Sequence, residues 1–501
     1  MKRYIRFIAV AVVFATQACF VVDAQKRPNI IWLMSEDIGP DLECYGMKAV
    51  RTPNLNSLAE GGIRYTNCFA SNPICSPNRS AMMVGVHQNK INAGNHRSNH
   101  DLVLPEPYKP FTYWLRQAGY TTVLGNSKVM GRGRKTDLNF KYTPLGSWDG
   151  KKNFGLFDKF DELPEQGQPF FAQIQLAVTH RGDWWDSIRS ISPHPVDPDK
   201  VELPSYLSDH PIIRMDWAKY LDQIEYMDRE VGILIEDLKR KGLYDNTVII
   251  FIGDNGRCQI KGKGYLYDPG IHIPLIIHWP EGIEPRQVKT GLVSAVDITA
   301  TILDLAGIKI PEYMDGRSLM NKDFHRDYVY SARDRWDDVP ERSRSVTTHK
   351  YKYIRNYMTE VPYDDHQAYL EFYRPALHVM RKLHFDNKLT DDQKQFFVQV
   401  KPEEELYDLE NDPEELNNLV SRAEFSSVLS KMREQLSREE KRDTPAKIVH
   451  RAAPSQAPVI LDWVRYNYPK DYLQMLEGKE IGYQKFNRMY TNRHKQARDE
   501  K

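Results

Sequence analysis

Several long apolar runs along the chain end abruptly in polar residues, and this pattern predicts buried strands of a parallel sheet. The four clearest runs are residues 29–34, 120–124, 169–178 and 247–252. Continuous apolar strands are typical of sheets covered by helices on both faces. Residues 215–241 form an amphipathic stretch with a basic last turn before Gly242, which predicts one of the covering helices. We therefore expect an α/β fold with a large, mostly parallel central sheet.

The polar residues that follow these runs predict a ligand site. In open α/β sheets the ligand binds at the carboxyl ends of the strands. The residues at these ends are Glu36, Asp37, Lys128, His180, Asp254 and Asn255. Carboxylates this close repel one another without a cation, and hard oxygen donors favour calcium or magnesium over zinc. Each acidic pair alone reads as an ordinary turn, but the two pairs together favour a metal site.

Basic residues are placed to join the same site. The candidates are Arg79, Lys128, Lys135 and Lys263. Arg79 follows Cys75 by four residues, which is one helical turn and the same helix face. Exposed lysines are usually solvated, but several cations and His180 around a divalent metal suit a tetrahedral oxyanion such as sulfate or phosphate.

The composition excludes some classes of protein and the N-terminus predicts export. The chain has 501 residues, a formal net charge of +1 and 41% hydrophobic residues, so a broad basic nucleic-acid surface is not expected. Residues 1–24 have the basic, apolar and small-residue regions of a secretory signal peptide, which predicts a secreted or periplasmic protein without a membrane span. The alternative is a lipoprotein signal ending at Cys19, which the preceding residues fit poorly. A Cys44–Cys68 disulfide stays open.

The segment "CSPNRSAMMVG", which begins at Cys75, carries the resemblance to a known family. A soft thiolate is an unusual nucleophile beside an oxygen-liganded cation, whereas the Cys-x-Pro-x-Arg pattern resembles the signature of the type I sulfatases. Other stretches are similar to family segments in the same order. These are "RPNIIWLMSEDIGPDLECYG", "IIFIGDNG", "KGKGYLYDPGIHIPLIIHWP", "VSAVDITATILDLAGIKIP" and "LYDLENDPEELNNL".

The resemblance implies an alkaline-phosphatase-like fold and a formylglycine mechanism. A maturation enzyme would oxidise Cys75 to formylglycine, whose hydrated aldehyde attacks sulfur and later releases sulfate. One calcium ion would be held by Glu36, Asp37, Asp254, Asn255 and the residue at position 75. Arg79 would activate the nucleophile, and the sulfate would contact His180, Lys263 and one of Lys128 or Lys135. Between the two candidate acids we favour His180, whose ordinary pKa lies near neutrality, with Lys263 as an electrostatic clamp.

The chain departs from the family pattern at two places. Glu36 stands where the family often has aspartate, and its longer side chain can still bind a metal. The family has a Gly-Lys-x-His segment after the strand expected at 120–124, but the residues that follow do not match it clearly. Lys128 and Lys135 therefore both remain candidates, and no histidine occupies the equivalent place.

Beyond the sulfate, the loops predict an anionic sugar as substrate. Candidate substrate-binding residues are His96, Arg97, Arg333 and Asp334. It is equally consistent with the sequence that they are ordinary residues of surface loops. The residue types in these loops resemble those of polysaccharide sulfatases and of the heparan N-sulfatase-like branch. Whether the substrate carries an O-sulfate or an N-sulfate stays open. The alternative function is a phosphoesterase or phosphonate monoester hydrolase of the same superfamily. A catalytically inactive carbohydrate-binding relative is disfavoured, because the nucleophile and metal ligands are present.

The composition changes after about residue 310, which predicts a second unit. We expect a catalytic domain over 25–345, a smaller C-terminal α+β subdomain with an antiparallel sheet over 346–450, and an extension over 451–501. "YKYIRN" at 351–356 predicts a strand, and the Asp-Pro turn in "ENDPEELNNL" predicts the start of a helix. Residues 362–400 are expected to be helical without a predicted position, and the tail from about 480 to be solvated or frayed.

Overall fold

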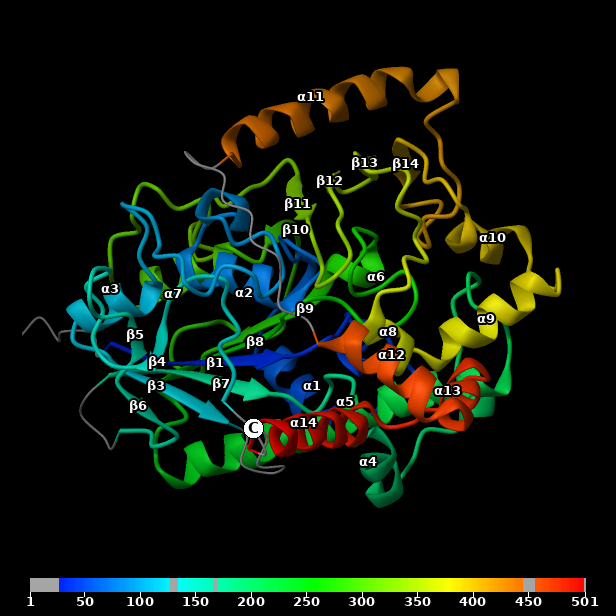
Figure 1. Cartoon of the computed structure of the whole chain (residues 1–501). Helices are drawn as coiled ribbons and strands as arrows, with labels where there is room; N and C mark the ends of the chain where they lie inside the picture. The colour runs from blue at the N-terminus through cyan, green and yellow to red at the C-terminus, as the bar shows by residue number, and fades with distance from the viewer. Residues whose placement is uncertain (1–26, 127–133, 165–168, 445–455, 500–501) are drawn as a thin grey trace, which may run out of the picture.

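An eight-stranded sheet forms the centre of the molecule in the computed structural model, which describes residues 27–126, 134–164, 169–444 and 456–499 (Figure 1). The strand order is β10-β2-β9-β8-β1-β7-β3-β6. The strands are β1 (Asn29–Ser35), β2 (Gly62–Phe69), β3 (Thr121–Asn126), β6 (Lys159–Phe160), β7 (Phe170–Leu176), β8 (Thr247–Gly253), β9 (His272–His278) and β10 (Gln287–Ser294). β1 runs parallel to both β7 and β8, whereas β9 is antiparallel to both of its neighbours. The predicted mostly parallel sheet and its four apolar strands are confirmed.

Helices cover both faces of this sheet, as the apolar strands require. Figure 1 shows α2, α3 and α7 above the sheet and α1 and α5 below it. Their bounds are α1 (Pro53–Glu60), α2 (Cys75–Val84), α3 (Phe111–Gln117), α5 (Pro211–Arg240) and α7 (Asp297–Leu305). The predicted helix at 215–241 is α5, which starts earlier because Pro211 occupies its first turn and the His210 side chain accepts a hydrogen bond from the Ile212 backbone.

A separate four-stranded antiparallel sheet forms the smaller subdomain. Its strands are β11 (Val329–Arg333), β12 (Ser343–Thr347), β13 (Tyr351–Asn356) and β14 (Glu404–Asp408), in that order. Helix α11 (Ser426–Arg442) packs Leu429, Met432 and Leu436 against the sheet. The second sheet confirms the predicted subdomain, and "YKYIRN" is β13. The domain boundary at 345/346 stays a prediction, and β11 lies on its N-terminal side.

The remaining elements include the segment whose position was not predicted from sequence. They are β4 (Thr143–Leu145), β5 (Gly155–Phe157), α4 (Trp185–Ile191), α6 (Asp268–Ile271), α8 (Ala368–Tyr373), α9 (Pro375–Phe385), α10 (Asp391–Lys394), α12 (Ala457–Asn467), α13 (Pro469–Leu476) and α14 (Tyr483–Asp499). None of the helices in the described ranges is long and apolar enough to cross a bilayer. The predicted signal peptide and Cys19 lie outside the described residues, and Cys44 and Cys68 are free thiols.

Two local predictions are wrong. No helix begins at the Asp-Pro turn, because the Asp412 carboxylate accepts hydrogen bonds from the backbone of Leu416 and Asn417 and holds a loop instead. The tail is not frayed at its start: Phe486 of α14 is fully buried in a cluster with residues of α8, α12 and α13. Apolar and aromatic side chains on one face of α14 pack into this cluster. In the sequence, the many charged residues between them hide this helical spacing.

Candidate active site

The ends of the neighbouring strands β1 and β8 bring the two acidic pairs together. Ser35 lies opposite Gly253 in the register, so the residues that follow each strand are adjacent. The Asp37 backbone N–H donates to Asp254 Oδ1 at 3.0 Å, and Asn255 Nδ2 donates to Asp37 Oδ1 at 3.0 Å. Asp37 has a positive φ of 48°, a backbone conformation that aspartate tolerates better than most residues.

Helix α2 starts at Cys75 and directs Arg79 into the same group of side chains. Arg79 Nε and Nη2 each lie 2.9 Å from Asp254 Oδ2, and Nη1 donates to Gln175 Oε1 at 2.8 Å. Gln175 Nε2 in turn donates to Glu36 Oε1 at 3.0 Å. Sequence reasoning did not select Gln175, although a glutamine inside the fully buried β7 is an available signal because a buried amide needs partners.

Each of the three carboxylates lies beside a different cation. Lys135 Nζ is 2.5 Å from Glu36 Oε2, Lys263 Nζ is 2.6 Å from Asp37 Oδ1, and Arg79 pairs with Asp254. Burial alone would raise the pKa of Asp37, but Lys263 holds it well below its usual value. The pKa of Asp254 is raised, because burial outweighs the effect of Arg79.

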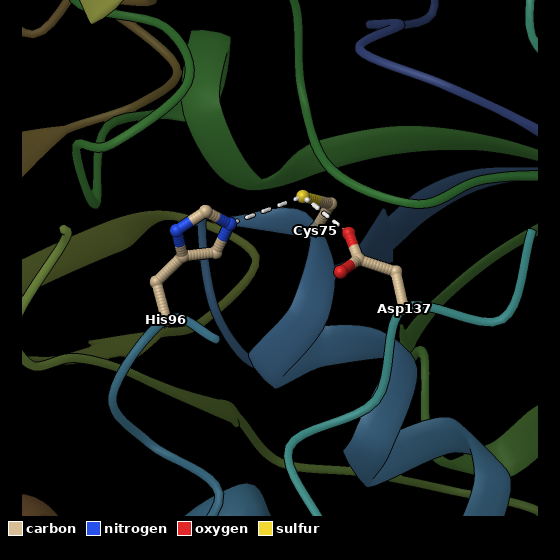
Figure 2. A group of neighbouring side chains, drawn as sticks. All are labelled: Cys75, His96 and Asp137. Carbon is tan, nitrogen blue, oxygen red and sulfur yellow. Dashed lines mark hydrogen bonds between the residues drawn. The ribbon is translucent and has the colours of Figure 1, made fainter. Parts of the chain in front are cut away.

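The Cys75 thiol has a carboxylate on one side and an imidazole on the other (Figure 2). Its Sγ lies 3.3 Å from Asp137 Oδ2 and 3.7 Å from His96 Nε2. Asp137 also receives two hydrogen bonds from Arg97, at 2.9 and 3.0 Å. His96 Nδ1 lies 2.6 Å from Asp337 Oδ1, which fixes the ring and leaves Nε2 facing the sulfur. Residue 75 is therefore held in a strongly polar setting.

His180 lies at the end of β7 with its Nε2 atom 3.9 Å from Glu36 Oε2. Its Nδ1 lies 3.0 Å from the Arg181 carbonyl, so Nδ1 carries the proton and Nε2 faces the carboxylate side. Burial, with the positive charges of Lys263 and Lys135, lowers the pKa of His180 to about 3. Although the carboxylates of Glu36 and Asp37 lie nearby, burial has the larger effect, and the imidazole is neutral near pH 7.

The oxygen donors of the acidic pairs fit a hard divalent cation. Asp37 Oδ2 and Asn255 Oδ1 are buried and have no hydrogen-bond partner in the described part of the chain. Buried polar atoms without partners are costly, and a cation would satisfy both. The side chains in Figure 2 offer sulfur, nitrogen and oxygen donors that suit zinc, but Asp137 already faces two cations, Arg97 and Lys135.

The remaining predicted residues lie in different settings. Lys128 lies outside the described residues, and the other candidate, Lys135, lies beside Glu36. Arg333 is buried and pairs with Asp365 at 3.0 Å, and Asp334 pairs with Arg344 at 3.0 Å. Both therefore have partners within the smaller subdomain, whereas the predicted His96 and Arg97 lie around residue 75.

The fold and these residues define the class of protein: a hydrolase of the alkaline-phosphatase-like class that cleaves esters of a tetrahedral oxyanion such as sulfate or phosphate. The sulfatase family model matches residues 28–308, and a model described as N-sulphoglucosamine sulphohydrolase, C-terminal, matches residues 256–366 and 359–442. The chain belongs to the sulfatase family and is a sulfuric ester hydrolase.

Named relatives agree with this assignment, and solved structures agree with the fold. An ulvan-active sulfatase from Formosa agariphila is 31% identical over 458 residues, covering 82% of this chain and 74% of that protein. Human N-sulphoglucosamine sulphohydrolase is 26% identical over 467 residues, covering 83% and 90%. A structure in complex with D-glucosamine-2-N,6-O-disulfate has a TM-score of 0.56 at 19% identity, covering 83% and 98%. A phosphonate monoester hydrolase from Silicibacter pomeroyi has a TM-score of 0.60 at 18% identity, covering 86% and 99%, which supports the fold.

Proposed function

We propose that this sulfatase hydrolyses sulfate esters of sulfated carbohydrates, with ulvan-type polysaccharides as the first candidate substrate and N-sulfoglucosamine glycans as the second. The observation that carries the proposal is the position of Cys75. It begins α2 one turn before Arg79, and Arg79 pairs with a member of the acidic group at the strand ends. The names of the relatives support a glycan substrate. The ulvan-active sulfatase, at 31% identity, supports an O-sulfated glycan. The human N-sulphoglucosamine sulphohydrolase and the matching C-terminal family model support an N-sulfated glycan.

Cys75 is the residue that a formylglycine-generating maturation enzyme would modify. Formylglycine would supply a hydrated aldehyde, an oxygen nucleophile that a cysteine side chain cannot offer. In the surrounding protein, Asp137 and His96 lie within 3.3 and 3.7 Å of the Cys75 Sγ atom. Their distances suit groups that accept and hold a proton at position 75.

Calcium would be held by Glu36, Asp37, Asp254 and Asn255 together with residue 75. When bound, the ion supplies positive charge that favours the ionised nucleophile and the sulfate oxygens. Arg79 keeps the Asp254 carboxylate in place through two contacts to one oxygen and leaves the other oxygen directed at the Asp37 backbone.

Three side chains would bind the sulfate and assist the departure of the alcohol. Lys263 and Lys135 carry the charge that neutralises sulfate oxygens, and His180 lies beside both. A bound sulfate raises the pKa of His180, because a nearby anion stabilises the imidazolium. His180 then becomes competent to protonate the leaving oxygen, with Lys263 as the clamp.

The substrate beyond the sulfate would meet His96 and Arg97 first. The Arg97 side chain is 47% exposed although it pairs with Asp137, so it can face an anionic sugar. Arg333 and Asp334 would contribute from the smaller subdomain. Sulfated glycans are extracellular polymers, so this function agrees with a secreted or periplasmic enzyme released from the signal peptide at 1–24.

The test compares matched substrates after the modification at residue 75 has been checked. The chain is coexpressed with a formylglycine-generating enzyme, and the peptide covering residues 72–85 is examined by mass spectrometry. Sulfate release is then measured from ulvan oligosaccharides and an N-sulfoglucosamine disaccharide, and 4-nitrophenyl sulfate is compared with 4-nitrophenyl phosphate. We expect ulvan oligosaccharides to react fastest, and Cys75→Ala to react with none. Faster hydrolysis of the phosphate ester, or no release from either glycan, would reject the proposal.

A further inference from the structure

Helix α8 lies directly against the active site, although it comes almost 300 residues after Cys75. Gln367 caps its first turn by accepting a hydrogen bond from the Leu370 N–H at 2.9 Å. The Gln367 Nε2 atom donates to Asp337 Oδ2 at 2.9 Å, and the other oxygen of Asp337 holds His96. The helix start is thus connected to residue 75 through three successive hydrogen bonds, which run from Gln367 to Asp337, from Asp337 to His96 and from His96 to Cys75.

Tyr369, the second residue of α8, contacts three parts of the active site. Its ring packs against the small apolar cluster that contains Cys75. The ring centroid is 5.8 Å from Lys263 Nζ and 6.1 Å from the His180 ring. Leu370 beside it is buried, whereas Tyr369 is partly exposed. A partly exposed aromatic side chain therefore borders the groups that would bind the sulfate and protonate the leaving alcohol.

The C-terminal helices hold this aromatic ring in position. Tyr369 lies 4.9 Å from Tyr373, whose ring lies 5.7 Å from Tyr483 at the start of α14. The Tyr373 hydroxyl donates to Asp183 Oδ1 at 3.3 Å, and the Gln484 backbone donates to Asp183 Oδ2 at 3.0 Å. Asp183 belongs to the loop of His180, so α8, α14 and that loop form one supported unit.

We propose that Tyr369 is the residue on which the desulfated sugar ring stacks, so that it determines specificity for the glycan leaving group. This inference rests on the proposed function. The apolar face of a pyranose fits an aromatic ring, which offers a large contact area at low entropic cost. The position suits this role because His180 is proposed to protonate the leaving oxygen, and the partly exposed Tyr369 ring lies 6.1 Å from the His180 ring.

The alternative is that Tyr369 positions Lys263 through a cation–π contact. The two roles separate in their effect on the two products. A residue that acts through Lys263 affects the binding of sulfate, whereas a residue that stacks on the sugar affects the binding of the desulfated glycan. Product inhibition measures both dissociation constants independently.

The experiment uses Tyr369→Leu and Tyr369→Phe, with Tyr466→Leu as the matched control because that tyrosine is 77% exposed on α12. Inhibition constants are measured for inorganic sulfate and for a desulfated glycan, with 4-nitrophenyl sulfate as reporter. The glycan is a desulfated ulvan tetrasaccharide or the N-desulfated glucosamine disaccharide, whichever matches the substrate that the wild type hydrolyses faster. Circular dichroism and thermal melts check that each variant is folded.

We expect Tyr369→Leu to raise the inhibition constant of the desulfated glycan about tenfold, the change that roughly 1.4 kcal/mol of lost stacking corresponds to. Tyr369→Phe and Tyr466→Leu should change it less than threefold, and the constant for sulfate should stay within twofold in all three. An equal rise for sulfate and glycan, or no rise for either, overturns the inference. If the wild type releases sulfate from neither glycan, the proposed function fails first and this inference falls with it.

Discussion

Arg374 is the residue whose replacement tests how the active-site loop of Lys263 is held. It lies between α8 and α9, is 2% exposed, and donates from Nε to the Cys258 carbonyl and from Nη2 to the Lys263 carbonyl, both at 2.8 Å. One planar guanidinium thus joins the two ends of a six-residue loop. Methionine has a similar length and no donor, so Arg374→Met removes both contacts and leaves a filled site.

The expected loss of stability follows from those two contacts. A buried carbonyl left without a partner costs about 1–3 kcal/mol. Part of this loss is offset, because the variant no longer buries a guanidinium, and burial lowers the pKa of Arg374. We therefore expect Arg374→Met to lower the free energy of unfolding by about 2–4 kcal/mol. Arg374→Lys should recover less than half of it, because an ammonium cannot reproduce the planar fork that reaches two carbonyls.

Activity separates a role in positioning from a role in stability alone. Because a shift of about 1 Å in a charged group can cost about 10²-fold in rate, kcat/KM for 4-nitrophenyl sulfate should fall about 10- to 100-fold in folded Arg374→Met. Urea denaturation gives the stability, and the rate is measured at a temperature where the variant is folded. The control is Arg240→Met on α5, where the side chain is 77% exposed and both quantities should stay unchanged. A destabilised variant that keeps kcat/KM within twofold would refute the positioning role.

Four further results are expected. Cys75→Ser should leave the melting temperature within about 2 °C and abolish turnover; an active serine variant in the absence of serine oxidation would contradict the formylglycine mechanism. Chelation should remove activity and lower the melting temperature, with calcium restoring both, whereas stoichiometric zinc in metal analysis would contradict the ligand assignment. His180→Ala should slow release from a sulfated sugar about 10²–10⁴-fold while sparing an aryl sulfate, and Lys263→Ala should slow both; the opposite pattern would exchange the two roles. Burial raises the pKa of Asp228 to about 6, above its unfolded value of about 4, so its contribution to stability is lost as pH rises through this range. Asp228→Asn should therefore gain stability relative to the wild type between pH 4.5 and 7, and a constant difference in urea denaturation would contradict this assignment.

The fold was predictable wherever a structural signal is local in sequence. The four apolar strands and α5 follow from continuous or periodic hydrophobic runs, and the structure has them within a few residues. The failures lie where tertiary contacts decide. The loop at Asp412 satisfies its backbone from a side chain, and Phe486 is buried by residues of three other helices, α8, α12 and α13.

The candidate site divides in the same way. The acidic pairs, Cys75 and Arg79 could be selected from sequence, because each stands at the end of a strand or the start of a helix. Tyr369 could not, because its importance depends on which distant side chains it meets. Gln175 has only the signal of an amide inside an apolar strand, and its partners Arg79 and Glu36 come from other parts of the chain. Lys135 and Lys128 follow the same predicted strand, at 120–124, and the choice between them stays a prediction.

The two halves of the site therefore have different origins in the chain. The nucleophile comes from α2, and the groups proposed to bind the sulfate come from loops that follow the central strands β3, β7 and β8, all within the range matched by the sulfatase model, residues 28–308. Of the groups proposed to meet the sugar, His96 and Arg97 lie within the same range, whereas Tyr369 comes from α8. Tyr369 is supported by α14, which lies beyond the last matched residue, 442. A change in α8 or α14 can alter the surface for the leaving group while the strand ends, which the packed sheet fixes, stay in place. Selection for a different glycan could therefore act on Tyr369 and on the C-terminal residues that support its ring, whereas Arg374, which holds the loop of Lys263, would be kept.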